Sequence, residues 1–565
     1  MAQPNPPGEV PTHSTQLYHL LFLAGSSFII LYASLLVIHT FALFLRVSLN
    51  DAATWLAVAL TLVYYGVVGR RVYRLPLVRL GLGLVGMVAI VAISVLISGY
   101  FIDLSWDGRD YHQKAIRELV DGWNPIYTEL QPRDVYDNVW LNHYPKGPWI
   151  AAASVAGLTG TIEAGKVFNL LLVAAVFLIA LSYLLPKQQL KPWQAGLLAL
   201  FLAANPVSMY QSLSYYVDGQ VSSLLILLAL LLLLCLESAD AGHLLALAAV
   251  IVVALNVKFT GTAYTLLLLA ISLLVTWLAR KRLLALPRIW LAIGVGILAG
   301  VFLVGFEPYI TNALHYRHPF YPLYGSRDFN LEFILDNQMP PNFETMNPVG
   351  RLAHSIFSPS QNTIGVPSAG MKFPLALARS EIAAFARPDV RVGGWGPLFG
   401  AILILAVAAW IGLFFVSRRV ALVALGLIAA ILAISLLNSE AWWARYTPQL
   451  WLIPVVILGA LWYVEDRRIR LAGNVLALLM FANIFLVSGA YLGWNTLSTR
   501  QVRATLVELK QSGERVMLYY GPLEAAGMRL QEYGIPYHWV AQREELACPV
   551  ELEIKVFYSP YDCPP

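Results

Sequence analysis

The polar stretch from residue 103 to residue 148 combines carboxylates, imidazoles, aromatic rings and a lysine, the side chains that acid–base and anion-binding chemistry uses. Asp107 and Asp110 stand three residues apart in SWDGRDYH, directly after an apolar run. Each carboxylate could serve as a general base, a metal ligand or a helix cap. Lys146 follows in HYPKGPW, between two prolines that restrict the backbone. A rigid loop that places this lysine near Asp107 would suit an anionic ligand.

A structural role explains Asp110 more easily than Asp107. Apolar residues recur at helical spacing from residue 111 to residue 123, which predicts an amphipathic helix in the membrane interface. Asp110 stands where the cap or first-turn acid of that helix belongs. Asp107 precedes Gly108 in a turn ahead of the helix, where a capping role explains it less easily.

Two further ionisable residues begin apolar segments: Asp218 in YYVDGQ and Lys258 in NVKFTG. Charged groups at the ends of membrane helices are costly, and they are candidates for function. Singly, each residue could be an interfacial anchor. Together with the 103–148 stretch, they predict acids and bases that converge on one outward-facing cavity.

The elements that must position these residues are membrane helices. The chain has 565 residues, of which 58% are hydrophobic and 13% are charged, and its mean hydropathy is +0.65. Soluble domains carry about a quarter charged residues, so the composition excludes a soluble enzyme and predicts an all-α polytopic membrane protein. The net charge is +5, and the Lys and Arg residues cluster in short loops between the apolar spans. This is the positive-inside pattern, and we expect no nucleic-acid partner.

About thirteen apolar spans are predicted, at residues 20–45, 52–69, 80–102, 167–185, 192–204, 217–236, 243–256, 260–279, 289–306, 395–416, 420–438, 446–464 and 471–493. The compact basic loops all fall on one side if the amino terminus is cytoplasmic; they are residues 69–79, 187–191, 280–288, 417–419 and 465–470. The acidic connector 237–242 is an exception on that side. We therefore expect a multi-pass protein of the cytoplasmic (inner) membrane whose long polar segments are extracytoplasmic.

This topology divides the chain into seven parts. They are a cytoplasmic leader (1–16), three N-terminal spans (17–102), a first extracytoplasmic loop with the amphipathic helix and the candidate acid (103–166), further spans (167–306), a long extracytoplasmic lid loop (307–394), the C-terminal spans (395–493) and an extracytoplasmic tail (494–565). The tail alternates as strand, helix, strand and strand, in the segments RVMLYY, PLEAAGMRLQEYG, PYHWVA and ELEIKVFY, which predicts a small α/β domain.

The order of several short motifs resembles the GT-C superfamily of integral-membrane glycosyltransferases. The motifs are DGRDYHQKAIRELVDGWNP, NHYPKGP, NPVSMYQSLSYYVDGQ, NVKFTG and WWARYTPQLWLIP. They are most similar to the branch that holds the protein O-mannosyltransferases and the lipid A aminoarabinose transferase, over roughly residues 80–465. The chain departs from the branch at Gly108, where an acid is usual, at the Gly-Pro that follows Lys146, and in two extra spans before the first loop.

The resemblance implies a monosaccharide donor on a polyprenyl phosphate, membrane lipids as surroundings, and the hydroxyl of a glycolipid, polysaccharide or protein as acceptor. Asp107 or Asp110 would be the base of an inverting displacement, and Asp218 would orient the acceptor or the sugar, or hold Arg109. The candidate phosphate-binding cations are Lys146, Arg109, Lys258 and Arg445. The candidate substrate-binding residues are Tyr111, His112, His143, Tyr144 and Tyr446.

Two other functions remain open on the sequence. One is a polymerase or ligase that moves a whole glycan from a lipid diphosphate. The other is a lipid or solute transporter or flippase, but the chain shows no internal repeat, and its ionisable groups gather at the outer ends of spans. No cofactor is assigned. A divalent metal could bind Asp107, Asp110, His112, His143 and Asp218, but their spacing fixes no ligand set.

Overall fold

The computed structural model describes residues 13–130, 135–279, 286–326, 338–513, 515–519, 525–540, 542–546, 550–552 and 556–559. Most of the predicted leader (1–16), and parts of the lid loop and the tail, therefore lie outside the described residues. Within them, ten helices are long and apolar enough to cross a membrane, and three shorter apolar helices accompany them. The predicted class, an all-α polytopic membrane protein, is confirmed.

Each predicted span coincides with a helix. These helices are α1 (His13–Phe44), α2 (Asp51–Val67), α3 (Leu77–Tyr100), α7 (Val167–Leu184), α8 (Pro192–Ala203), α10 (Asp218–Glu237), α11 (Ala241–Leu255), α12 (Phe259–Ala279), α13 (Leu286–Leu298), α18 (Phe399–Val416), α19 (Arg418–Leu436), α20 (Leu452–Tyr463) and α21 (Arg467–Ser512). Runs of Leu, Val, Ile and Ala satisfy their backbone groups only as helices in an apolar medium, which explains this correspondence.

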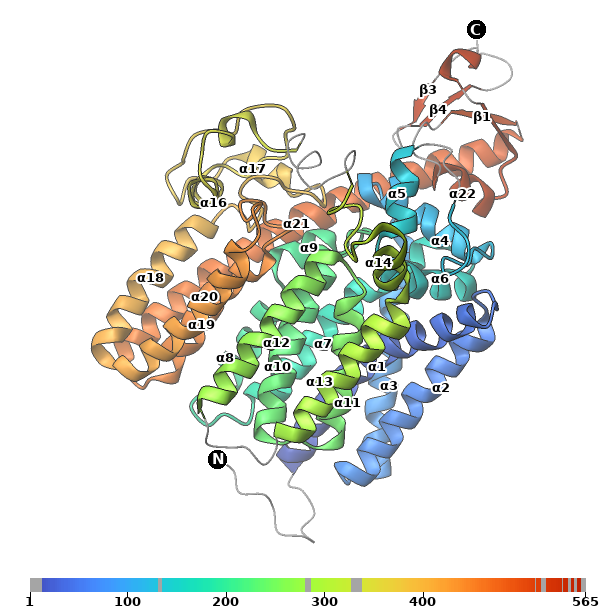
Figure 1. The fold of residues 1–565 in the computed structure, drawn as a ribbon. Coiled ribbons are helices and arrows are strands. Elements are labelled where there is room, and N and C mark those ends of the chain that lie inside the picture. Colours follow the sequence, from blue (N-terminus) through green and yellow to red (C-terminus); the bar gives the residue numbers. More distant parts are fainter. Residues whose placement is uncertain are drawn as a thin grey trace.

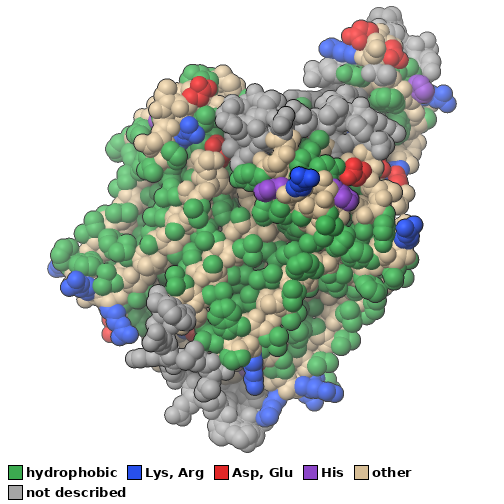
Figure 2. All heavy atoms as spheres, in the orientation of Figure 1, with side chains coloured by type: hydrophobic (Ala, Val, Ile, Leu, Met, Phe, Trp, Pro, Cys, Tyr) green, Lys and Arg blue, Asp and Glu red, His purple; other side chains and the backbone are tan. Residues whose placement is uncertain are grey.

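Shorter helices lie at one end of the bundle. They are α4 (Gln113–Val120), α5 (Val135–His143), α6 (Gly147–Thr159), α9 (Pro206–Gln211), α14 (Thr311–Tyr316), α16 (Pro348–Phe357), α17 (Arg379–Ala384) and α22 (Ala525–Glu532). Figure 1 shows these helices and the strands at the upper end, while the turns that join α2 to α3 and α18 to α19 lie at the lower end. Figure 2 shows Lys and Arg side chains along that lower edge. The basic turns within the described residues thus lie at one end, the pattern that the positive-inside rule predicts; most of the basic loop 280–288 lies outside the described residues.

Helix α10 lies at the centre of the bundle, and its buried polar residues connect it to its neighbours. Gln220 accepts a hydrogen bond from Tyr32 (2.9 Å) and donates one to Asn169 (2.7 Å). Asn169 in turn donates to the backbone carbonyls of Gln211 and Ser214. Because buried polar groups must be paired, this chain of bonds fixes α1, α7 and α10 against the loop that leads to Asp218.

The tail forms a small α/β domain, as predicted. Its strands are β1 (Val516–Tyr519), β2 (Tyr537–Trp539), β3 (Val550–Leu552) and β4 (Val556–Ser559), in the sheet order β2-β1-β4-β3. Strand β1 pairs in parallel with β2 and antiparallel with β4, and β3 pairs antiparallel with β4. The sequence ELEIKVFY, expected to form one strand, instead contributes to two that pair with each other. Helix α21 passes the expected boundary at residue 494 and runs without a break to Ser512.

Arg529 of α22 connects this domain to the first loop. Its side chain is 2% exposed, and it donates to Glu163 Oε1 (2.9 and 3.0 Å) and to the backbone carbonyl of Asp103 (2.6 Å). The other Glu163 oxygen accepts from Lys166 (2.5 Å) and from the Asp103 amide (3.1 Å). The domain is therefore docked through a buried ionic network.

We expect Arg529→Met to undock the α/β domain. The substitution leaves Glu163 Oε1 and the Asp103 carbonyl buried without the donors that Arg529 supplies, while Lys166 still pairs with the other Glu163 oxygen, so we expect a loss of about 1–3 kcal/mol. The measurement is the melting temperature of the purified protein, together with proteolysis of the region around residues 513–525. Arg515→Met, at an exposed position in the same domain, is the matched control. Equal melting temperatures of the two variants would contradict the role of Arg529.

Candidate functional site

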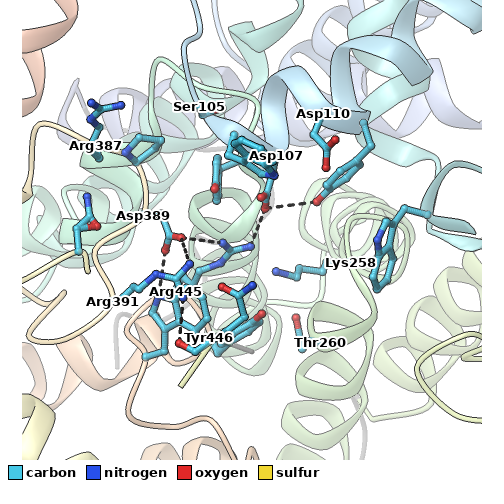
Figure 3. A pocket seen from close by; sticks show the side chains of 18 of the residues that line it. Ser105, Asp107, Asp110, Lys258, Thr260, Arg387, Asp389, Arg391, Arg445 and Tyr446 are labelled. Carbon is cyan, nitrogen blue, oxygen red and sulfur yellow. Dashed lines mark hydrogen bonds and ion pairs between the residues drawn. The ribbon is translucent and has the colours of Figure 1, made fainter. Parts of the chain in front are cut away.

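A pocket of about 790 Å³ opens at the polar end of the bundle. Its walls come from four separate parts of the chain: the first loop, the segment before α10, the start of α12 and the stretch that leads to α20. The lid loop closes the remaining side. The ionisable and tyrosine side chains in its lining are Asp107, Asp110, Tyr111, Tyr144, Tyr216, Lys258, Arg387, Asp389, Arg391, Arg445 and Tyr446 (Figure 3).

Asp107 is held on a wide helical turn, Gly108–His112, that precedes α4. Turns of this π type are frequent at functional sites, because they re-aim side chains. Gly108 is required here: a Cβ would lie 2.1 Å from the carboxylate of Asp103. The Asp107 carboxylate lines the pocket and accepts hydrogen bonds from Arg445 (2.9 Å) and from the Tyr111 hydroxyl (3.5 Å). It is thus oriented and charge-balanced while still facing open space.

Arg445 lies at the centre of three carboxylates. Its guanidinium nitrogens are 2.9 Å from Asp107, 3.1 Å from Asp218 and 3.5 Å from Asp389. Burial lowers the pKa of this guanidinium, but the three carboxylates together hold it well above its usual value. The ring of Tyr216 lies 4.7 Å from the guanidinium carbon, within the range of a cation–π contact. Arg445 therefore joins three distant parts of the chain at one point.

Asp218, the first residue of α10, pairs with a second cation. Its Oδ1 lies 2.5 Å from Lys258 Nζ, and its Oδ2 accepts from Gln211 (3.2 Å) as well as facing Arg445. Burial lowers the pKa of Lys258, and the Asp218 carboxylate opposes that shift. Lys258 lines the pocket and lies 4.8 Å above the ring of Tyr446. Figure 3 shows Lys258 pointing into the space beside Arg445.

Sequence reasoning missed Asp389, Arg387 and Arg391, which line the pocket from the lid loop. The Asp389 carboxylate accepts a hydrogen bond from the Trp443 indole N–H (3.0 Å). The Arg391 guanidinium lies 3.8 Å from the same carboxylate. Burial raises the pKa of Asp389, against the effect of the Arg445 and Arg391 cations. The only signal in the sequence is ARPDVRV, an acid between two arginines in an otherwise weakly charged loop.

The structure does not bring Lys146 to the pocket lining. This residue is 2% exposed; its ammonium pairs with Glu307 (3.1 Å) and donates to the carbonyls of Asn142 and Tyr144. Burial lowers the pKa of Lys146, with Glu307 opposing the shift. The expected approach of Lys146 to Asp107 is therefore replaced by an internal ion pair, because the acid that neutralises Lys146 comes from the helical turn Phe306–Ile310, which lies beyond α13 in the chain.

We expect Lys146→Met to destabilise the protein by about 3–5 kcal/mol, since Glu307 would keep an unpaired charge in the interior. The double variant Lys146→Met, Glu307→Gln removes both charges and should recover most of that loss. Chemical or thermal unfolding in detergent measures both effects. A stable single variant would contradict the structural role of this pair.

The other predicted site residues divide between the pocket and its surroundings. Asp110, Tyr111, Tyr144 and Tyr446 line the pocket. Arg109 is buried and donates to the carbonyl of Ser105 (3.2 Å); burial and the nearby Arg529 lower the pKa of Arg109 to about 10. Asp218 thus holds Arg445 and Lys258, and no bond from Asp218 to Arg109 is seen among the described residues.

The two histidines also lie outside the pocket lining. His112 accepts the Trp149 indole proton at Nδ1 (2.6 Å), and burial lowers the pKa of His112 to about 3. His143 lines a second cavity of about 260 Å³ and contacts Asn312 (3.0 Å). Burial lowers the pKa of His143 to about 4. The five residues considered as metal ligands do not converge, and the described part of the chain holds no group of three or more such side chains that could bind a metal.

No family model and no curated protein match the chain. Among solved structures it is similar to ArnT from Cupriavidus metallidurans bound to undecaprenyl phosphate, with 14% sequence identity over 82% of this chain and 86% of that chain and a TM-score of 0.41. The same protein in the apo state gives 14% identity over 81% and 86% and a TM-score of 0.35. TM-scores this low do not by themselves establish a common fold or function.

Proposed function

We propose that the chain is a membrane glycosyltransferase of the GT-C type, which moves a monosaccharide from a polyprenyl phosphate to an acceptor hydroxyl. One observation carries the proposal: four of the motifs on which the resemblance rests meet in one pocket. They contribute Asp107, Asp218, Lys258 and Arg445, which are linked by direct ion pairs. A fifth motif contributes Tyr144, although its lysine lies elsewhere.

The pocket has the groups that such a transfer needs. Asp107 is the general base, because it faces the cavity and its position is fixed by Arg445 and Tyr111. It removes the proton of the acceptor hydroxyl as the oxygen attacks the anomeric carbon, and the bond from that carbon to the donor phosphate breaks. Polyprenyl phosphate leaves as an anion, so no acid is needed for the leaving group. Because the acceptor oxygen attacks the face of the sugar opposite the leaving phosphate, the anomeric configuration is inverted.

Cations around the pocket stabilise the charge that develops on the leaving phosphate. Lys258, Arg387 and Arg391 all line the cavity, in addition to Arg445. Hydrogen-bonded cations in a site of low dielectric constant are effective at this task, because they need no reorganisation during the reaction. Asp218 pairs with Lys258 and Arg445, and Asp389 pairs with Arg391 and Arg445, which holds these three cations in place.

The size of the cavity favours a monosaccharide over a whole glycan. A volume of about 790 Å³ lies in the usual range of small-molecule sites. The transporter alternative gains no support from the position of the charges: the three paired carboxylates gather at one end of the bundle, outside or at the first residue of a span.

The pocket and the α/β domain are proposed to face the outer side of the cytoplasmic membrane. The basic turns gather at the opposite end of the bundle, as Figures 1 and 2 show, and positive loops remain cytoplasmic. A reporter that is active only after export should therefore be active when fused after Pro565. Activity of a cytoplasmic reporter at the same position would overturn this orientation.

The direct test uses the purified chain in lipid nanodiscs with a panel of polyprenyl-phosphate sugars. Consumption of one donor and release of polyprenyl phosphate, detected by mass spectrometry, is the expected result. Envelope glycans from cells with and without the chain then identify the acceptor by the sugar that is lost. If neither donor consumption nor a glycan difference is observed, the proposed function is wrong.

A further inference from the structure

We propose that residues 364–377 of the lid loop, here called the strap, insert into the headgroup region of the outer leaflet. The ligand is thus a phospholipid surface. This inference rests on the membrane topology of the helices and is independent of the proposed reaction.

The strap exposes apolar side chains to an unusual degree for a segment outside the membrane spans. Its exposed residues are Ile364, Val366, Met371, Phe373, Leu375 and Leu377. Phe373 is 72% exposed and Met371 is 62% exposed, values that lie on either side of the 70% exposure of Leu478 on the span helix α21. Leu478 lies in a span with lipid for its surroundings, whereas isolated exposure on this scale in water marks an interaction surface.

Lys372 fixes the level of the strap relative to the membrane. Its backbone amide donates to the carbonyl of Phe357 (2.8 Å), and its ammonium donates to the carbonyl of Pro397 (2.7 Å). Pro397 directly precedes α18, which begins at Phe399 and is one of the candidate spans. The flanking side chains of Met371 and Phe373 are therefore held at the height where the apolar medium begins.

Further contacts hold the side chain of Lys372 in place. Its ammonium pairs with Glu381 of α17, a carboxylate that is 3% exposed and also accepts from the backbone amides of Ser360 and Ala378. Close packing adds to this: a Cβ on Gly400 would lie 2.9 Å from the Phe357 ring. The strap is thus attached to the start of the span by several independent contacts.

The surroundings of the strap have the chemistry of a membrane interface. Arg379 is exposed at its end, where it can pair with lipid phosphate. Nearby on the same lobe, Arg387 lies 5.2 Å from the ring of Trp494, which is itself partly exposed on α21. Tryptophan and arginine side chains are typical of the headgroup region. Figure 1 shows α16 and α17 directly above the end of α18.

The strap also reaches the pocket. Ile364, at its beginning, is one of the residues that line the cavity. The strap therefore connects the pocket wall with the exposed apolar side chains of Met371 and Phe373.

Spin-label accessibility in nanodiscs tests the inference. The label is placed by Phe373→Cys in a chain whose Cys548 and Cys563 are replaced by serine, Cys235 being buried. Leu478→Cys is the lipid-facing control and Glu544→Cys, at an exposed position of the α/β domain, is the aqueous control. We expect a ratio of oxygen to water-soluble nickel accessibility at residue 373 several-fold above that at residue 544 and close to that at residue 478.

Two outcomes would overturn the proposed insertion of the strap into the headgroup region. A ratio at residue 373 equal to that at residue 544 would place the strap in water. Low accessibility to both reagents would mean that protein covers the strap, whether a second copy of the chain or another partner. Repeating the measurement with Met371→Cys separates a local effect of one label from the behaviour of the strap.

Discussion

Asp107→Asn is expected to reduce transfer by about 10²–10⁴-fold, the usual contribution of a general base. The amide keeps the shape of the carboxylate but cannot take the acceptor proton. Because Arg445 also contacts Asp218 and Asp389, it remains paired in this variant. We therefore expect kcat to fall while the melting temperature and the binding of polyprenyl phosphate change little.

The assay is turnover in nanodiscs, alongside donor binding under the same conditions. Asp110→Asn is the matched comparison, since Asp110 also lines the pocket and is the second candidate for the base. A larger loss of turnover for Asp110→Asn than for Asp107→Asn would transfer the base role to Asp110. Full turnover in Asp107→Asn would remove Asp107 from the chemistry.

Arg445→Lys is expected to lower kcat at least about tenfold although it keeps the charge. An ammonium is a point charge, and it cannot reach three carboxylates in three directions as the planar guanidinium does. Asp107 would lose its fixed orientation, and Asp389 would lose its ion pair with residue 445 and keep the hydrogen bond from the Trp443 indole. We expect the lid loop to loosen, so that proteolysis within residues 379–394 becomes faster.

Arg387→Lys is the matched control, because Arg387 lines the same pocket but is exposed. Because lysine keeps a cation at this position, we expect kcat to fall far less in Arg387→Lys than in Arg445→Lys. If Arg445→Lys has wild-type kcat and wild-type proteolysis, then the three-carboxylate cluster does not order the site.

Apolar runs predicted the fold because a membrane leaves the backbone few choices. Thirteen runs became helices, including the short α8 and α11, since each is apolar over its length. The alternation of strand and helix patterns in the tail was also sufficient to predict its α/β domain. By contrast, the division of ELEIKVFY into β3 and β4 depends on pairing with β1, which local alternation does not reveal.

The site was predictable only in part. Asp107, Lys258 and Arg445 could be selected because charges at the ends of apolar spans are rare. The contact of Arg445 with Asp107 joins residues 338 positions apart, and no spacing rule predicts it. Asp389 was missed because it lies in a loop whose sequence shows neither helical nor strand periodicity. Lys146 was misplaced because its partner, Glu307, lies in a segment whose path the sequence does not define.

The position of Arg529 has a consequence for the order in which the site is completed during synthesis. The loop that carries Asp107 leaves the ribosome after α3, whereas Arg529 follows α21. Asp103, whose carbonyl Arg529 binds, also accepts the backbone amides of Ser105 and Tyr215 and so supports both acid-bearing segments. A chain with all its membrane helices but without α22 would therefore lack the buried cation that holds these segments together. The reactive pocket would reach its final geometry only after the last helix has been inserted and the domain behind it has folded.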